Sequence, residues 1–180
     1  ARYLQLALRN ARKHDIAVHA YALMGNHVHL LLTAREAKRC SGFMHDLGSM
    51  YAGWFNERHA RTGSLWEGRY RNCIVDCNSY LWNCHRYVEL NPVRAGLVER
   101  PDDYRWSSHG ANALGRIDPL VSPRPEYLCL GNTAEARCQA YRTFIGRSWA
   151  SDEEAFACLR RGGVVGSREI VVKSVGPQVS

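Results

Sequence analysis

Two short extended segments, separated by only two residues, constrain the fold of this chain of 180 residues more than any other feature. In the first, apolar residues alternate with other residues up to Met24, which is typical of a strand with one buried face. The alternating residues are Ile16, Val18, Ala20 and Ala22. After the turn Gly25-Asn26, residues 27–32 form a second extended run. Because so short a connection cannot cross over a sheet, the two strands are expected to pair antiparallel as a hairpin.

Helical periodicity lies on both sides of this hairpin. The chain opens at Ala1, without a methionine, already inside an amphipathic helix, which suggests a fragment or a processed form. From Glu36 to Glu57 apolar residues recur at three- and four-residue spacing, which predicts a long helix with one buried stripe. Residues 69–75 look extended again. Residues 76–79 then offer capping side chains for a helix that Pro92 is expected to end.

The remaining third of the chain shows weaker patterns. A short helical stretch is expected after Ser107, and two further helices near residues 133–145 and 152–161. The tail from Gly162 has no pattern that assigns it. The length suits one well-buried core with an appendage. We therefore expect a main domain at residues 1–115, followed by a C-terminal helical extension and tail at residues 116–180.

Charge and cysteine content indicate the environment and the partner. The net charge of +7 comes mostly from arginine, which favours an anionic polymer as partner, although a plain soluble protein with an arginine-rich surface is the alternative. Seven cysteines without a CxxC pair suggest reduced thiols in a cytoplasm. A zinc site is a weaker alternative, and its ligands would be Cys73, Cys77, Cys84 and His85. No apolar run is long enough for a membrane helix, so we expect a soluble cytoplasmic protein without a membrane partner.

Four residues on two elements carry the candidate chemistry. Alternate side chains of a strand share a face, so His27 and His29 project together, about 7 Å apart, and can supply two ligands to a metal ion. Tyr87 and Asn91 are four residues apart on the following helix, and Asn91 offers a carbonyl oxygen at the negative end of that helix. A tyrosine is a nucleophile at neutral pH only beside a cation or a base, which a metal ion would supply. Taken alone, a tyrosine at helical spacing is more often a packing residue.

These residues resemble a known family. Residues 24–32 resemble the histidine-hydrophobic-histidine motif of the single-tyrosine HUH transposases, and residues 86–98 resemble their tyrosine helix. Within that group the chain is most similar to the REP-associated tyrosine transposases. Supporting similarities occur at residues 51–56, 63–71 and 103–108, and the resemblance covers roughly residues 1–146.

The resemblance implies an α+β fold, with a ferredoxin-like antiparallel sheet and helices on both faces. It also implies that Tyr87 attacks single-stranded DNA folded into hairpins and forms a 5′-phosphotyrosine, while His27, His29 and Asn91 bind Mg²⁺ or Mn²⁺. The main domain would then be the catalytic domain. The chain departs from the family in two ways. Gly25 replaces a usual proline, and the strand that precedes the first helix in the family is not found.

A basic segment with aromatic residues predicts contact with DNA independently of the resemblance. Arginines that bind phosphates and rings that stack on bases are the mixture expected for single-stranded nucleic acid. The residues of this segment are Arg58, Arg61, Trp66, Arg69, Tyr70 and Arg71. We also expect Arg94 and Arg105 near the substrate. A solvated basic face is the alternative interpretation.

Two rival functions stay open from the sequence. A histidine-triad nucleotide hydrolase also has alternating histidines on a strand, but Leu31 occupies the place of its third histidine. A domesticated protein that binds hairpin DNA without cutting it would keep the fold and lose the chemistry. The sequence does not decide between a monomer and a homodimer.

Overall fold

The computed structural model describes residues 1–75, 78–147, 163–165 and 169–175, and it has an α+β fold. The elements are α1 (Arg2–His14), β1 (Ile16–Leu23), β2 (His27–Ala34), α2 (Ala37–Arg58), β3 (Arg71–Val75), α3 (Asn78–Arg94), the short 3-10 helix η1 (Pro101–Asp103), α4 (His109–Asn112), α5 (Pro125–Leu128), α6 (Ala134–Ile145), β4 (Gly163–Val165) and β5 (Glu169–Val175). The helix expected at residues 152–161 lies outside the described residues.

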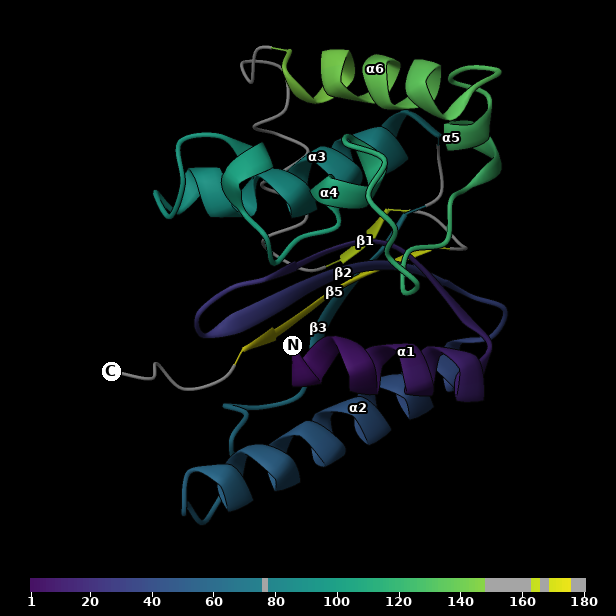
Figure 1. Ribbon diagram of the computed structural model, residues 1–180. Helices are drawn as coiled ribbons and strands as arrows, with labels where there is room; N and C mark the ends of the chain where they lie inside the picture. Colours follow the sequence, from purple (N-terminus) through teal and green to yellow (C-terminus); the bar gives the residue numbers. More distant parts are fainter. Residues whose placement is uncertain (76–77, 148–162, 166–168, 176–180) are drawn as a thin grey trace.

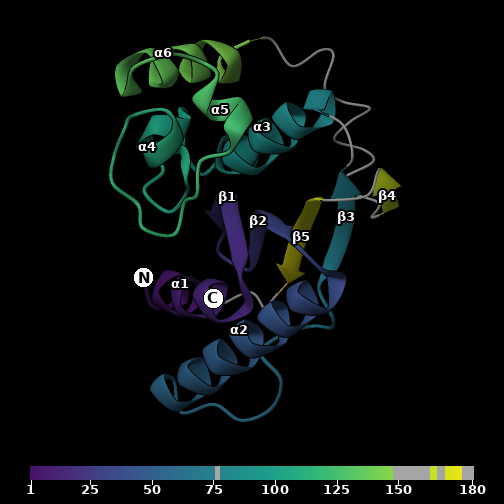
Figure 2. The same ribbon diagram turned by 90° about the vertical axis from the view of Figure 1, so that its right-hand side faces the viewer.

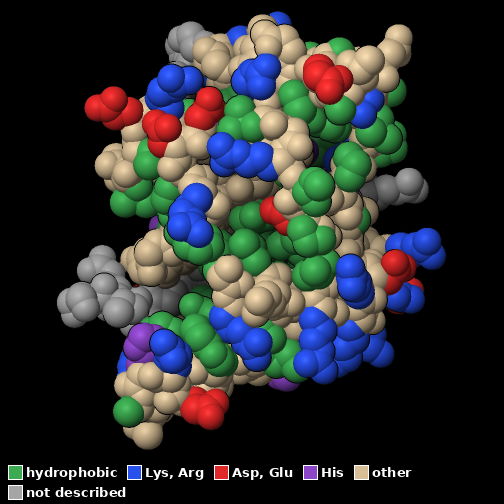
Figure 3. All heavy atoms as spheres, viewed as in Figure 1, with side chains coloured by type: hydrophobic (Ala, Val, Ile, Leu, Met, Phe, Trp, Pro, Cys, Tyr) green, Lys and Arg blue, Asp and Glu red, His purple; other side chains and the backbone are tan. Residues whose placement is uncertain are grey.

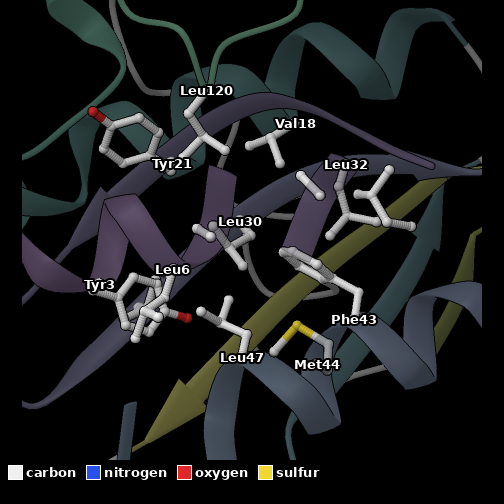
Figure 4. Close-up of a cluster of buried hydrophobic side chains, with 14 of the residues drawn as sticks. Tyr3, Leu6, Val18, Tyr21, Leu30, Leu32, Phe43, Met44, Leu47 and Leu120 are labelled. Atoms are coloured by element: carbon white, nitrogen blue, oxygen red, sulfur yellow. The ribbon is translucent and has the colours of Figure 1, made fainter. Parts of the chain in front are cut away.

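Helices cover both faces of one sheet, as the resemblance implies (Figure 1). Helices α1 and α2 lie against one face, and α3 lies against the other with α4 beside it and α6 beyond it (Figures 1 and 2). Figure 4 shows the apolar core on the α1 and α2 side, where Leu30 and Leu32 of β2 meet Phe43 and Leu47 of α2. No helix in the described part of the chain is long and apolar enough to cross a membrane.

Strands β1 and β2 form the predicted antiparallel hairpin, from the pair Ile16 and Ala34 to the pair Leu23 and Val28. The expected alternation along β1 is wrong in one respect, because the register shifts between Val18 and Ala20. A bulge adds one residue and reverses which face the following side chains occupy. Val18 therefore packs on the α1 side, whereas Ala20 packs on the α3 side.

The strand at the centre of the sheet comes from the C-terminal end of the chain. The order is β1-β2-β5-β3-β4, and β5 pairs antiparallel with both β2 and β3 (Figure 2). The unassigned tail thus contains a strand of the main sheet, at the position between β2 and β3. The sheet is not wholly antiparallel, since the edge strand β4 pairs parallel with β3.

Helix α3 continues through Pro92 to Arg94, so the expectation that this proline ends the helix is wrong. Proline removes one backbone donor, but it sits close enough to the C-terminus for the next amides to find acceptors. The backbone N–H groups of Ala95 and Leu97 donate to the carbonyl oxygens of Asn91 and Pro92, respectively. Tyr87 consequently lies two turns before the end of α3.

Candidate active site

The two histidines of β2 lie side by side on the face of the sheet that α3 covers. Leu31, two residues beyond His29, packs against α3, while Val28 and Leu30 pack on the opposite side, as the strand period requires. The ring centroids of His27 and His29 are 4.8 Å apart, with one ring edge directed at the other. His27 is half-buried, whereas His29 is 1% exposed. The two histidines therefore lie together, as the strand period predicts, and the side chain of His29 is shielded from solvent.

Tyr87 meets this pair from helix α3. Its ring centroid is 5.4 Å from that of His29, and the two rings are nearly perpendicular. The guanidinium carbon of Arg94 lies 5.7 Å from the Tyr87 ring centroid, so this predicted substrate residue lies beside the predicted nucleophile. Two imidazoles of β2 thus converge with a phenol of α3 that lies 58 residues beyond His29 in the sequence.

Asn26 orients the imidazole of His27. From the sequence, Asn26 was predicted only to be part of the turn between the two strands. The Nδ1 atom of His27 lies 2.7 Å from Oδ1 of Asn26. Since that amide oxygen can only accept, His27 donates from Nδ1 in the neutral ring, and the contact fixes the orientation of the imidazole. Hydrogen bonds of this kind commonly fix the orientation of metal-binding imidazoles. A polar residue directly before the His-x-His motif was the available sequence signal.

Asn91 is held so that its carbonyl oxygen is the acceptor left for a ligand. Its Nδ2 atom donates to the backbone oxygen of Tyr87 at 2.5 Å, one helical turn back. Two imidazole nitrogens and one amide oxygen are a reasonable donor set for a divalent cation that keeps water ligands as well. Among the described residues no three His, Cys, Asp or Glu side chains cluster. His27, His29 and Asn91 remain the candidate ligands that the sequence indicates.

A buried polar network anchors α3 next to these residues. Glu89 accepts hydrogen bonds from Ser108 Oγ at 2.5 Å and from Asn112 Nδ2 at 2.8 Å, and it lies 3.0 Å from Nδ1 of His109. Burial opposes ionisation of Glu89, but its hydrogen bond and attraction to His109 outweigh burial and lower the pKa of Glu89. Burial likewise opposes the charge on His109, and the contact with Glu89 prevails and raises the pKa of His109. An ion pair therefore joins α3 to α4 two residues from Tyr87.

The predicted DNA-binding arginines lie at the surface near the end of α2 and the start of β3. Arg58, Arg61, Arg69 and Arg71 are all exposed, and Arg61 lies 5.8 Å from the centroid of the Phe55 ring. The two rings of the segment are half-buried. Trp66 donates from Nε1 to the Gly48 oxygen at 2.9 Å, and the Tyr70 hydroxyl lies 3.2 Å from Ser41 Oγ. Arg105 is exposed and stacks 4.4 Å from the centroid of the Trp106 ring.

A second basic face lies along α1, and the sequence interpretation gave it no role. Its exposed cations are Arg2, Arg9, Arg12 and Lys13. Figure 3 shows lysine and arginine side chains gathered over this helix. Lys13 pairs with Asp46 of α2 at 2.6 Å, and α1 itself contains no acidic residue. The positive charge of the chain is thus spread over two faces.

An α+β domain in which a helix brings a tyrosine against a strand with two alternating histidines is the architecture expected of a single-tyrosine transposase. The chain belongs to the family of IS200-like transposases, whose description, "Transposase IS200 like", matches residues 1–91. That range includes all four residues of the candidate site. Comparisons with curated proteins and with solved structures found no match. Family membership removes the support for the histidine-triad interpretation.

Proposed function

We propose that this transposase cuts and rejoins single-stranded DNA through Tyr87, and that His27, His29 and Asn91 hold the divalent cation that the reaction needs. The single observation that carries the proposal is the convergence of Tyr87 with the histidine pair, 5.4 Å from His29 between ring centroids. These residues are far apart in sequence and on different elements. A packing tyrosine alone would not require two imidazoles beside it, so the grouping favours chemistry.

Transfer of DNA to the tyrosine accounts for joining as well as cutting. The phenol oxygen of Tyr87 attacks the phosphorus, the phosphodiester bond to the 3′ oxygen breaks, and a free 3′ hydroxyl leaves. The phosphotyrosine conserves the energy of the broken bond, so a returning 3′ hydroxyl can reverse the step without an outside energy source. The 5′ polarity of the link follows from the resemblance to the REP-associated transposases. Arg94, beside the Tyr87 ring, would stabilise negative charge on the phenol and the phosphate.

The cation proposed for this site is Mg²⁺ or Mn²⁺. His27 would bind it through its imidazole, which the contact of Nδ1 with Asn26 orients, and Asn91 would bind it through its carbonyl oxygen. When bound, the cation would polarise the phosphodiester and favour the deprotonated tyrosine. The proposed substrate is a DNA hairpin with a single-stranded flank, and the exposed arginines at residues 58–71 would contact its phosphates.

The test uses Tyr87→Phe, which removes the nucleophilic oxygen and nearly keeps the shape of the side chain. Hairpin DNA labelled on either side of the cut is incubated with each protein and Mn²⁺, and products are separated on a denaturing gel. The unchanged protein is expected to remain linked to the 5′ phosphate of the fragment downstream of the cut, and to release the upstream fragment with a free 3′ hydroxyl. Mass spectrometry should locate the link at Tyr87. Tyr87→Phe should bind the hairpin normally and form no adduct. An adduct in the Phe variant, or one at Tyr70, contradicts the assignment.

A second candidate function is a hairpin-binding protein that has lost cleavage. The observation that favours it is the burial of Tyr87, which is only 5% exposed and packs among Leu81, Cys84 and Val88. The same gel separates the two functions, because a pure binder shifts the DNA on a native gel and gives no linked product.

A further inference from the structure

The carboxylate of Glu89 in α3 is tied to the backbone of β1 through two other side chains. It is fully buried and accepts hydrogen bonds from Ser108 and Asn112. Oγ of Ser108 also accepts from the backbone N–H of Tyr21 at 2.9 Å. Nδ2 of Asn112 also donates to the carbonyl oxygen of His19 at 3.1 Å. Helix α3 is therefore linked to β1 at two points along the strand.

Strand β1 extends this link to the histidine strand. Ala22, the residue after Tyr21, pairs with His29 of β2 in the hairpin. On α3, Glu89 lies two residues after Tyr87. The connection that starts at Glu89 and runs through β1 to β2 thus ends at the contact between Tyr87 and His29, whose ring centroids are 5.4 Å apart.

The apolar contacts between α3 and β1 involve small side chains of the strand. Where α3 packs on the sheet, β1 contributes Ala20 and Ala22. Because apolar attraction has no direction and methyl groups interlock little with a helix, these contacts hold α3 against β1 but restrain sliding weakly. Hydrogen bonds depend on distance and angle, so the bonds of Glu89 restrain it. Apolar side chains of similar volume are often as stabilising as a buried charged network, so packing alone does not call for a carboxylate.

We propose that Glu89 is a positioning residue, whose contacts with Ser108 and Asn112 fix α3 along the sheet and so hold the hydroxyl of Tyr87 where it attacks the DNA. This inference rests on the proposed function and adds a residue that is fully buried and acts through the helix. A misplacement of about 1 Å can slow a reaction about a hundredfold. Loss of Glu89 should therefore lower the rate of the chemical step and not the affinity for DNA.

The test measures two quantities with Mn²⁺ present: the rate at which the protein becomes linked to saturating hairpin DNA, and the affinity for that hairpin. Glu89→Ala removes the carboxylate, and Ser108→Ala cuts its link to Tyr21 while leaving its other partners. The matched control is Ser107→Ala, because this neighbouring serine is also buried but its Oγ donates to the carbonyl oxygen of Tyr104 at 3.3 Å. Circular dichroism establishes that each variant is folded at the assay temperature.

Glu89→Gln is the conservative variant that should restore the position of α3. Its amide oxygen can accept from Ser108 and Asn112 as the carboxylate does. Its amide nitrogen takes the place of the carboxylate oxygen that lies 3.0 Å from Nδ1 of His109, and it can donate to that nitrogen in the neutral ring. Rescue by glutamine would show that the hydrogen bonds, and not the charge, carry the effect.

Glu89→Ala is expected to become linked about a hundredfold more slowly than the parent protein and Ser108→Ala about tenfold more slowly, both with unchanged affinity for the hairpin. Glu89→Gln and Ser107→Ala should match the parent protein in both quantities. A parental rate in folded Glu89→Ala would overturn the inference and leave the tyrosine chemistry intact. If Glu89→Ala does not fold, equal rates for Ser108→Ala and Ser107→Ala would overturn it instead. Absence of any linked product from the parent protein would overturn the proposed function itself.

Discussion

At the scale of single residues, the two histidines differ in burial although the strand pattern treats them alike. His29 lies between β2 and α3 at 1% exposure, whereas His27 is half-buried at the hairpin tip. The sequence predicted that alanine at either position would leave the fold intact, on the assumption that both side chains lie off the packed face. The burial of His29 shows that this assumption holds better for His27.

His27→Ala and His29→Ala are both expected to abolish metal-dependent cleavage, but only His29→Ala should destabilise the fold. Deleting the buried ring leaves a cavity against α3, which we expect to cost about 2 kcal/mol or more. His27→Ala should change the free energy of unfolding by less than about 1 kcal/mol. Urea denaturation gives the stabilities, and calorimetric titration with Mn²⁺ shows whether metal binding is lost. Unimpaired Mn²⁺ binding by both variants would remove the histidines from the cation site.

Two other buried histidines should make the fold sensitive to acid. Burial lowers the pKa of His19 and of His85 from 6.5 to about 4. Below about pH 6.5 the unfolded chain takes up protons at these positions and the folded chain does not, so unfolding becomes more favourable as pH falls towards 4. Each histidine contributes up to about 3 kcal/mol over that interval.

The check is urea unfolding at several values between pH 7.5 and 4.5, with His85→Gln as the variant. Glutamine stays neutral and can still accept from the Tyr141 hydroxyl, which lies 3.2 Å from Nδ1 of His85. The slope of the unfolding free energy against pH should fall by up to about 1.4 kcal/mol per pH unit, the value for one proton. A slope that does not change would show that His85 titrates alike in the folded and unfolded chains.

At the scale of elements, local pattern predicts the helices and the hairpin well. The spacing of apolar residues is sufficient to predict α1, α2 and α6, because each helix buries one stripe of its surface. The two-residue turn is sufficient to predict the antiparallel pairing of β1 and β2. The errors occur where tertiary contacts decide. Pro92 is tolerated inside α3 because the backbone amides that follow it find acceptors. The bulge after Val18 cannot be recognised from the alternation of apolar residues in the sequence.

In the candidate site, too, local sequence pattern predicts some features and tertiary contacts decide the others. The period of a strand predicts that His27 and His29 lie together, and the spacing in α3 places Tyr87 and Asn91 one turn apart. That β2 and α3 face each other came from the resemblance to a family. The contact of Asn26 with His27 depends on geometry that no spacing rule predicts.

The exposed arginines near the connection between α2 and β3 lead to a prediction about the salt dependence of DNA binding. Arg69 lies on it and Arg71 begins β3, and both are exposed, as Arg9 and Arg12 are on α1. If the first pair binds phosphates, the double change Arg69→Ala with Arg71→Ala should flatten the plot of log affinity against log salt by about one to two units. Arg9→Ala with Arg12→Ala removes the same charge from the α1 face and should leave the slope nearly unchanged. A larger effect from the α1 pair would place the DNA on the other face.

At the scale of the whole molecule, β5 joins the hairpin of β1 and β2 to β3 in one sheet, although β5 lies about 100 residues beyond β3 in the sequence. Strand β5 pairs with β2 over seven positions, so that Val172 is opposite Leu30 on one side and opposite Asn72 of β3 on the other. Such pairing between distant segments has no local signature, which explains why the tail could not be assigned from its sequence. The histidine strand therefore depends for one of its two neighbours on residues about 140 positions further along the chain.

Proline at position 172 tests this dependence directly. Proline cannot donate to a ladder and is tolerated almost only at sheet edges, so Val172→Pro in the central strand should cost about 3 kcal/mol or more and should also weaken Mn²⁺ binding, because the histidine strand loses its support. The matched control is Val164→Pro in β4, which is an edge strand among those that the structure describes and pairs with β3. That change should cost clearly less and should spare the cation site. Urea denaturation and hydrogen exchange of the amides in residues 27–34 would report both effects, and equal stability of the two proline variants would show that β5 does not hold the centre of the sheet.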